Sequence, residues 1–371
     1  MTDYDVIIVG AGIAGASVAS EISEDCSVLI LEAEYQPGYH STGRSAAFWT
    51  ESYGGPLVQP LTTASCAFLK NPPAGISEKS LLLQRGAINI GRTEEAHLAD
   101  QLLSAFSGSG VAMDRWSREE IQTRVPLLKT GWDHAIFEPD CCDIDVAGLH
   151  TGYLANARRN GTVIQCNARV TNISRTNDIW RVKAGDKSYS APVLVNAAGA
   201  WADTITNFAG AAPIGIQPML RTMVQLRTDP PSHPDVPLVV ALDGSFYFKP
   251  EASGSYWLSP HDETAVLPGD VAPEEMDVAV AIDRFLSVLD VNVQSVTRKW
   301  AGLRSFAPDR LPVYGFDPEI PGFFWFAGQG GFGIQTAPAA AKLAHALLLG
   351  NPKGDDLNSI NPDRYDPARF R

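Results

Sequence analysis

The sequence predicts a two-domain protein of the α/β class, and three observations support this prediction. The chain has 371 residues, more than a single hydrophobic core usually organises. Residues 4–34 follow the order strand, glycine-rich turn, helix and strand, which is typical of a parallel α/β sheet. Another strand that ends in glycine appears much later, in APVLVNAAGAWAD at 191–203. The first domain is therefore expected to be discontinuous, with a second, mixed-sheet α+β domain built from the segments between its pieces.

Composition and charge exclude several classes of protein. Hydrophobic residues make up 45% of the chain and charged residues 19%, as in ordinary globular proteins. The formal net charge is -13, so we expect no nucleic-acid partner and attribute the acidity to solubility. The most apolar stretch, APAAAKLAHALLLG, carries Lys342 and His345 and is too short for a membrane span, so stable membrane insertion is not expected. The first strand-like run starts at Tyr4, which leaves no room for a signal peptide.

The five cysteines predict neither a disulfide framework nor a metal site. Their number is odd, their spacing is irregular, and no C-x-x-C or H-E-x-x-H motif occurs. Cys141 and Cys142 are adjacent, and we interpret them as reduced, structural residues. Reduced cysteines suit a reducing compartment, so a cytoplasmic location is expected.

The N-terminal segment has the features of a Rossmann-like nucleotide-binding unit. Residues 6–9 form a continuous apolar run, as expected of a buried parallel strand. In the turn GAGIAG, Gly10 permits a tight bend, Gly12 lets the backbone approach a pyrophosphate, and Gly15 lets the helix pack close to the strand. The free amides and the dipole at the helix N-terminus then favour the phosphates.

An acidic residue completes this unit. The second strand, SVLILE, ends at Glu32, which lies 22 residues after Gly10. A carboxylate at this distance accepts hydrogen bonds from a ribose diol and repels a 2′-phosphate, so NADP is not expected. A glycine motif alone is a weak signal. The strand before it, the helix after it and the acid make this one specific.

A second glycine motif near the C-terminus is a candidate for a second nucleotide-binding site. GQGGFG, with Gly328, Gly330 and Gly333, follows the apolar run FFWFA and precedes a helix-like stretch. After Gly350, however, the chain is polar and proline-rich, and no strand follows to carry a ribose-binding acid. We therefore interpret this motif as a loop and helix N-terminus that serve the first nucleotide, so that one dinucleotide is bound.

The chain returns to the nucleotide domain twice, whereas an NAD enzyme usually keeps that domain contiguous. The segments GAGIAGAS, GYHSTGRSAA, VNAAGAW, SFYFKP, WAGLRSF and GQGGFGIQT span nearly the whole sequence. In this order the sequence resembles the D-amino-acid oxidase superfamily of FAD enzymes, most closely its bacterial D-arginine dehydrogenase branch. The resemblance implies an FAD-binding domain of residues 1–85, 145–215 and 300–371. The substrate domain would comprise residues 86–144 and 216–299.

The resemblance also implies which residues surround FAD. They are Gly10, Gly12, Ile13, Ala14, Gly15, Glu32, Ser41, Thr42, Arg44, Ser45, Ala46, Val170, Gly199, Trp201, Gly330, Gly333, Ile334 and Gln335. Arg44 would oppose the diphosphate charge, and Val170 would lie at the adenine. From the residues alone, the alternatives are a solvated arginine on a surface loop, which the small polar neighbours of Arg44 disfavour, and a plain strand residue at Val170. No cysteine follows Cys166, so non-covalent FAD is expected, and we interpret His40 as a loop histidine.

Two arginines are candidates for binding a substrate carboxylate. Arg221 lies in QPMLRTMVQL and Arg304 in WAGLRSFAP, both largely apolar stretches. Such an arginine either extends to solvent or meets an anion in a pocket, and the residues alone leave this open. The resemblance places both on the carboxylate, where a guanidinium pairs bidentately. It also places the phenols of Tyr53 and Tyr247 near the substrate, with the Gly331 carbonyl accepting from the substrate amine.

The sequence departs from the arginine-using branch at two positions. Phe48 stands where that branch has a histidine, and the segment at Gly86 lacks the acid that pairs with a distal guanidinium. We therefore expect Phe48, Trp49 and Tyr53 to form an apolar pocket wall. Glu51 could supply a charge there, but alternation along a strand could turn it outward.

The predicted function is oxidative deamination of a D-amino acid with a neutral or apolar side chain. Hydride transfer from Cα to the flavin would give an imino acid, which hydrolyses to a 2-oxo acid and ammonia. The alternative is a glycine, sarcosine or other secondary-amine oxidase. Two alternatives come from other functional classes: an NAD-linked dehydrogenase, and a flavoprotein that binds its cofactor but does not turn over substrate. The sequence leaves open whether oxygen or a quinone accepts the electrons.

Overall fold

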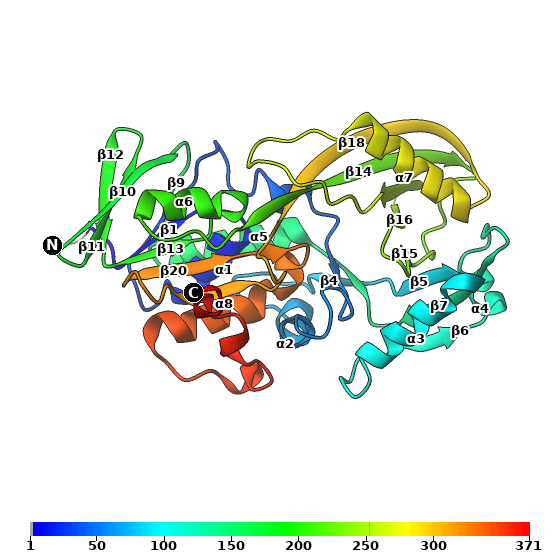
Figure 1. Ribbon diagram of the computed structural model, residues 1–371, viewed down its shortest axis with the longest axis horizontal. Helices are drawn as coiled ribbons and strands as arrows, with labels where there is room; N and C mark the ends of the chain where they lie inside the picture. Colours follow the sequence, from blue (N-terminus) through cyan, green and yellow to red (C-terminus); the bar gives the residue numbers. More distant parts are fainter. Residues whose placement is uncertain (1–2, 252) are drawn as a thin grey trace.

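The computed structural model describes residues 3–251 and 253–371 and shows an elongated molecule with two halves (Figure 1). One half contains a six-stranded sheet and the other a nine-stranded sheet. The long strands β14 (Gln217–Asp229) and β18 (Asn292–Phe306) reach from the middle of the molecule to its far end (Figure 1). The predicted α/β class with mixed sheets is confirmed.

The six-stranded sheet is parallel except at one edge. Its order is β19 (Val313–Phe316), β20 (Phe323–Ala327), β13 (Val193–Asn196), β1 (Val6–Val9), β2 (Val28–Leu31) and β9 (Val163–Gln165). The edge strand β19 runs antiparallel to β20, and the other pairs are parallel. Strands β1, β2 and β20 are continuous buried apolar runs, as expected when both faces of a sheet are covered.

Side chains along β1 alternate between two hydrophobic cores, because successive residues of a strand point to opposite faces. Val6 and Ile8 belong to a core that includes residues of four helices. These helices are α1 (Ile13–Ile22), α2 (Gln59–Lys70), α5 (Val146–Arg159) and α8 (Gly333–Leu349). Ile7 and Val9 belong to the opposite core, under a small sheet and one helix. These elements are β10 (Val170–Thr176), β11 (Ile179–Ala184), β12 (Lys187–Ala191) and α6 (Ala202–Ala209).

The nine-stranded sheet forms most of the other half. Its order is β21 (Gln329–Gly330), β18, β14, β17 (Ser255–Ser259), β16 (Tyr247–Glu251), β15 (Leu238–Ala241), β5 (Ala87–Arg92), β7 (Trp132–Glu138) and β6 (Asp114–Trp116). Helix α7 (Glu275–Val288) packs on this sheet through Phe285 and Val288. The remaining elements are α3 (Ala96–Ala105), α4 (Arg118–Arg124) and a small sheet of β3 (Phe48–Trp49), β8 (Cys142–Ile144) and β4 (Leu82–Gln84).

Strands β14 and β18 carry functional candidates to the junction of the two halves. They pair antiparallel, so Arg221 lies opposite Gly302, two residues before Arg304. The end of β18 is buried, and β21 pairs with it so that Ser305 lies opposite Gly330. This pairing brings the second glycine motif beside Arg304. The division of the chain into two domains at the predicted boundaries remains a proposal.

Two further features of the structure concern the cysteine thiols and the length and apolarity of the helices. All five cysteines are free, and burial raises the pKa of the Cys142 thiol to about 11. Among residues 3–251 and 253–371, no helix combines the length and apolarity that a membrane crossing requires.

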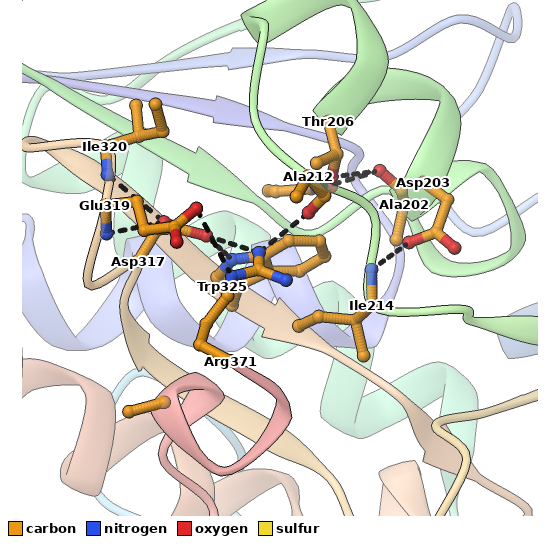
Figure 2. Close-up of polar contacts among 12 residues, drawn as sticks. Ala202, Asp203, Thr206, Ala212, Ile214, Asp317, Glu319, Ile320, Trp325 and Arg371 are labelled. Carbon is orange, nitrogen blue, oxygen red and sulfur yellow. Dashed lines mark hydrogen bonds and ion pairs between the residues drawn. The ribbon is translucent and has the colours of Figure 1, made fainter.

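A buried carboxylate ties the last residues to the six-stranded sheet (Figure 2). Asp317 follows β19 and accepts hydrogen bonds from the backbone amides of Glu319 and Ile320 at 3.0 and 3.1 Å. Its other oxygen accepts from Trp325 Nε1 and from Arg371, both at 2.9 Å. Burial alone would raise the pKa of Asp317, but these hydrogen bonds outweigh burial and hold its pKa below the usual range.

We predict that Asp317→Asn destabilises the protein by about 2–4 kcal/mol at pH 7, because an amide group would face two donors and leave Arg371 without its partner. Since the pKa of Asp317 is lower in the folded chain, its contribution should be complete at neutral pH and should disappear below about pH 4. Urea unfolding at several pH values measures this difference. The exposed Asp186→Asn is the control. An Asp317→Asn protein as stable as wild type at pH 7 would contradict the prediction.

Candidate functional site

A long cavity lies at the carboxyl ends of β1, β2 and β13, where ligands usually bind in α/β sheets. Most of the predicted FAD residues line it, namely Gly10, Gly12, Ile13, Ala14, Glu32, Ser41, Thr42, Ser45, Val170, Gly199, Trp201, Gly330, Gly333 and Ile334. Two predicted substrate residues, Arg304 and Gly331, line the same cavity. The fold therefore brings segments that are far apart in the sequence to one elongated space.

The first glycine motif is required by close backbone contacts. Gly10 has a φ of +102°, and a Cβ atom there would lie 2.6 Å from the carbonyl oxygen of Ala197. A Cβ atom on Gly15 would lie 1.9 Å from the carbonyl oxygen of Gly10, so this glycine packs helix α1 against the turn. At Gly12 the Cβ atom would lie 3.3 Å from Thr42 Oγ1 on the cavity wall. The tight turn predicted at Gly10 and the close packing predicted at Gly15 thus have a geometric basis, while the approach of a pyrophosphate to Gly12 stays a prediction.

The carboxylate of Glu32 is buried on the cavity wall, and each of its two oxygens accepts one hydrogen bond. One oxygen accepts from the Ala11 amide at 2.8 Å, and the other accepts from the Glu34 amide at 2.9 Å. A carboxylate oxygen has two acceptor sites, so both oxygens retain capacity for a ribose diol. The two backbone contacts also fix the orientation of the side chain.

A short 3₁₀ helix at Ser41–Arg44 forms another wall of the cavity. The hydroxyl of Thr42 accepts from the Ile13 amide at 2.9 Å, so the loop is tied to the start of α1. The hydroxyl of Ser41 donates to the carbonyl of Leu303 at 2.7 Å, so the loop is also tied to β18 beside Arg304. These bonds place small polar side chains along the cavity.

The structure places Arg44 differently from the prediction. Its guanidinium pairs with Asp270 and donates to the carbonyls of Ala301 and Val271 at 3.0 and 3.2 Å. These partners lie on the outer side of the loop, so the side chain points away from the cavity. Arg44 therefore anchors the loop to its surroundings, and its geometry does not fit the predicted contact with a diphosphate.

Gln335 and Ala46 also lie outside the cavity. Gln335, on α8, donates to the carbonyls of Thr50 and Tyr53, both at 3.2 Å, and to Thr62 at 2.9 Å. Its role in the structure is to hold the turn that carries Tyr53. Ala46 is buried and lies two residues after the 3₁₀ helix Ser41–Arg44. In the chain, Ala46 directly follows Ser45 and Gln335 directly follows Ile334, and Ser45 and Ile334 both line the cavity.

A second cavity opens beside the first, and we call it the vestibule. Residues 53–57 form one side, residues 306–311 the other, and His261 and Glu263 complete the wall. Tyr53 lies between the two cavities, since a Cβ atom on Gly331 would lie 1.9 Å from the Tyr53 hydroxyl. Arg310 and Leu57 are exposed, so the vestibule leads from solvent toward Tyr53.

Two buried guanidinium groups lie close enough to interact electrostatically: Arg304 lines the long cavity, whereas Arg221 lines neither cavity. Arg221 is 2% exposed, donates from Nε to the carbonyl of Asp262 at 3.0 Å, and pairs with Glu263 at 3.2 Å. Arg304 is 7% exposed, and its hydrogen bond to the Leu303 carbonyl is long, at 3.5 Å. Within residues 3–251 and 253–371, no acidic side chain forms an ion pair with Arg304.

The pKa values of the two arginines shift in opposite directions. Burial lowers the pKa of Arg304, and the neighbouring charge of Arg221 lowers it further. Burial acts in the same direction on Arg221, but two tyrosines together with Asp262 and Glu263 outweigh it and raise its pKa. Arg304 is therefore a buried cation without a counter-charge, which is costly unless an anion arrives.

Aromatic and imidazole groups surround the arginine pair. The ring of His261 lies 5.8 Å from that of Tyr247 and 6.4 Å from that of Tyr53. Burial and the charge of Arg221 lower the pKa of His261 to about 4, so the imidazole is neutral at physiological pH. Its Nδ1 hydrogen bonds with the carbonyl of Gly244, while the Tyr247 hydroxyl contacts Met223 Sδ at 3.0 Å. Sequence reasoning missed His261, although SPHDET directly after a strand was an available signal.

Phe48 lies outside both cavities, in an apolar cluster with Ala87, Cys141 and Leu238. Its ring packs edge-on against Tyr247, with centroids 6.2 Å apart. The Nζ of buried Lys249 lies 5.2 Å from the Phe48 ring. The predicted apolar wall of Phe48, Trp49 and Tyr53 does not form as one surface, because the three residues belong to three different hydrophobic clusters, and a cation adjoins the cluster of Phe48.

That cation is already neutralised, and the acid considered at Glu51 is not available. Lys249 pairs with Asp143 at 3.1 Å and with Glu251 at 2.9 Å. Glu51 is buried rather than turned to solvent, and it accepts a hydrogen bond from Thr63 on α2. Burial raises the pKa of Glu51. The structure thus directs Glu51 toward α2 instead of the substrate side.

The fold and the cavity define a dinucleotide-binding α/β protein with a buried cationic site. The family profile described as FAD dependent oxidoreductase matches residues 5–347. The chain therefore belongs to the FAD-dependent oxidoreductase family, and its cofactor is FAD. An NAD-linked dehydrogenase is set aside.

Curated relatives and solved structures agree with this family. The chain is 23% identical to glycine oxidase of Geobacillus kaustophilus, covering 98% of this chain and 97% of that protein. It is 24% identical to human mitochondrial dimethylglycine dehydrogenase, covering 97% of this chain but only 44% of that protein. The crystal structure of L-proline dehydrogenase from P. horikoshii matches with a TM-score of 0.84 and 22% identity, covering 99% and 97% of the two chains. The likeness to the D-arginine dehydrogenase branch stays a prediction.

The residues of the long cavity fit FAD. The Gly10 turn and the start of α1 offer backbone amides to a pyrophosphate, and Glu32 offers two carboxylate oxygens to a ribose. Val170 lies on the wall near Glu32, and Gly330, Gly331 and Arg304 lie on the wall toward the vestibule. An extended dinucleotide would therefore run from the Glu32 end toward the arginine pair.

We predict that the FAD is non-covalent, so acid precipitation should release all the yellow colour into the supernatant. Among the described residues that line the cavity, His40 is the histidine that could form a covalent link, and none is a cysteine. His40→Ala is therefore the matched variant, and it should release its colour in the same way. Colour that stays with the wild-type pellet but not with the His40→Ala pellet would contradict the prediction.

Proposed function

We propose that this protein oxidises the carbon–nitrogen bond of a small α-amino acid of the glycine or N-methylglycine type. The observation that carries the proposal is the unpaired Arg304 guanidinium, buried beside Arg221 at the wall of the FAD cavity. A substrate carboxylate supplies the missing counter-charge. Guanidinium groups suit this task because they bind carboxylates bidentately and stay ionised.

The two arginines would divide the carboxylate between them. Arg221 spends Nε on Asp262 and one terminal nitrogen on Glu263, which leaves donors on its other terminal nitrogen. Arg304 retains nearly all of its donors. A carboxylate between the two groups would remove their mutual repulsion. Binding of the substrate carboxylate would therefore be electrostatically favourable.

The amino group is proposed to lie toward Tyr53 and Gly331. The Tyr53 hydroxyl lies against Gly331, and Gln335 holds the carbonyl of Tyr53 at 3.2 Å. The backbone amide of Glu51 donates to Glu138 at 2.7 Å, and Ser52 donates to the same carboxylate at 2.6 Å, so the turn has a second anchor. The turn is therefore rigid enough to fix the position of the phenol.

The bound FAD supplies the chemistry, because its flavin ring accepts a hydride from the substrate Cα. The imine product then hydrolyses to an oxo acid and ammonia, or to an amine when the nitrogen carries a methyl group. The protein contributes orientation through the arginines and excludes water with the aromatic rings of Tyr53, Tyr247 and His261. Neutral His261 adds no further positive charge near the amine.

Substrate size is proposed from the packing of Phe48. Its ring packs edge-on against Tyr247 in the apolar cluster and lines neither cavity, so we propose that it leaves no space for a long substrate side chain. A glycine-like substrate needs no space there. Relatives named glycine oxidase and dimethylglycine dehydrogenase support this choice.

A D-amino acid with an apolar side chain is the second candidate. The cluster of Phe48, Ala87, Cys141 and Leu238 is apolar, so a rotated Phe48 ring would expose a hydrophobic pocket. A cationic side chain would lack a partner, because Lys249 already occupies Asp143 and Glu251. We also propose a cytoplasmic location, with oxygen or a quinone as the electron acceptor.

Anaerobic reduction of the bound flavin by single amino acids tests the substrate class. Glycine or sarcosine should bleach the flavin fastest, D-leucine and D-methionine more slowly, and D-arginine slowest. If D-leucine or D-methionine is fastest, the second candidate replaces the first. If no member of the panel bleaches the flavin, both candidates are refuted.

We predict that Arg304→Met lowers kcat/KM about a hundredfold or more, mainly through KM, because a partly desolvated ionic contact is lost. FAD should remain bound. The variant should unfold at the same temperature as wild type or higher, since an unpaired buried cation has been removed. Arg298→Met, an exposed position on the same strand, is the control and should change neither quantity. An unchanged kcat/KM in Arg304→Met would eliminate the proposed role.

A further inference from the structure

A chain of three charged residues leads from the arginine pair to the surface of the vestibule. Glu263 accepts from Arg221 at 3.2 Å on its inner side and from Arg310 at 2.8 and 3.0 Å on its outer side. The exposed fractions of the three side chains are 2% for Arg221, 33% for Glu263 and 51% for Arg310. We call this row the Glu263 relay. It places a negative charge on the vestibule wall, directly against Arg221.

The position of Glu263 is fixed by its neighbours in the chain. Asp262 accepts from the backbone amide and hydroxyl of Thr222 at 2.7 and 2.9 Å. The carbonyl of Thr264 accepts from the Leu220 amide at 2.8 Å. Both flanking residues are therefore bound to β14 on either side of Arg221. The carboxylate of Glu263 has little freedom to leave the vestibule wall.

Arg310 is held in a matching position. It lies in a turn after β18 with a φ of +64°, and its amide donates to the carbonyl of Ala307 at 2.9 Å. Its guanidinium lies over the ring of Phe306, 3.9 Å from the centroid. Arg310 therefore neutralises Glu263 from the solvent side, and Glu263 in turn keeps Arg310 from acting as a free cation in the vestibule.

We propose that Glu263 determines specificity by excluding a second carboxylate from the vestibule, so that the site selects amino acids with one carboxylate over dicarboxylic ones. This rests on the proposed function, in which Arg221 and Arg304 bind the substrate carboxylate. A monocarboxylate passes Glu263 once and then lies between the arginines. A dicarboxylate would leave its second charge beside Glu263, where like charges repel in a partly desolvated space.

The relay also sets affinity for the first carboxylate. Glu263 occupies one donor of Arg221 and screens its charge, so its removal should tighten the binding of any carboxylate. Removal of Arg310 should act oppositely, because Glu263 would then carry its full charge toward the incoming anion. With Glu263 removed and Arg310 present, the vestibule would contain a free cation suited to a second carboxylate.

Acetate and malonate are suitable probes, because neither has an amino group to oxidise. Their dissociation constants follow from the change in flavin absorbance when they are titrated into the oxidised holoenzyme. Glu263→Gln should bind acetate about tenfold more tightly, the size expected for one partly desolvated ionic contact, and should gain clearly more for malonate. Arg310→Met should bind acetate severalfold more weakly. The double variant should keep the acetate gain and lose the extra malonate gain.

Controls separate this inference from the proposed function. Glu274→Gln removes an exposed negative charge at the start of α7 and should change neither constant. If Arg304→Met binds acetate like wild type, the proposed function itself fails. If Arg304→Met loses acetate while Glu263→Gln gains equally for both probes, or for neither, only the role of Glu263 is overturned. Arg310→Met keeps the test valid should Glu263→Gln fail to fold, because unchanged acetate binding there would also refute the relay.

Discussion

Two positive charges buried side by side are the constraint on which the site depends. Arg221 and Arg304 lie on neighbouring strands, and their charges repel each other in a space that excludes water. Burying such a pair is unfavourable, so the surrounding structure must hold it in place. The long pairing of β14 with β18, the backbone carbonyl of Asp262 and the carboxylate of Glu263 do so. The remaining imbalance is the basis on which we propose that the site binds an anion.

The same strands connect the cationic site to the cofactor. β18 ends beside β21, so the second glycine motif lies against the strand that carries Arg304. Ser41 reaches the carbonyl of Leu303, and this ties the loop of the FAD cavity to the same strand. The proposed substrate arginine and two walls of the cofactor cavity are therefore attached to one strand, β18. Rigid strands suit this task better than loops, because small displacements reduce hydride-transfer efficiency.

Most residues that the sequence assigned to FAD line one cavity in the structure, and those of the first unit contact the backbone next to them. Gly10 and Gly15 are required by contacts within the first strand–turn–helix unit, and Glu32 ends the next strand. Resemblance extended this to distant segments but did not give side-chain directions. Arg44 turned to Asp270, and Gln335 turned to the Tyr53 turn. In both cases the polar group is satisfied by partners far away in the sequence.

By itself, the sequence determined the α/β class, the strand–turn–helix–strand unit around the first glycine motif, and the family to which the chain belongs. The period of the hydrophobic residues and the spacing of the glycines are local properties, so both can be recognised without knowledge of the fold. Only the tertiary structure decided that no acidic side chain of residues 3–251 and 253–371 forms an ion pair with Arg304, that Phe48 packs in a cluster outside both cavities, and that Glu263 lies between Arg221 and Arg310. Those facts depend on which distant residues meet, because electrostatic compensation and packing are properties of neighbours in space.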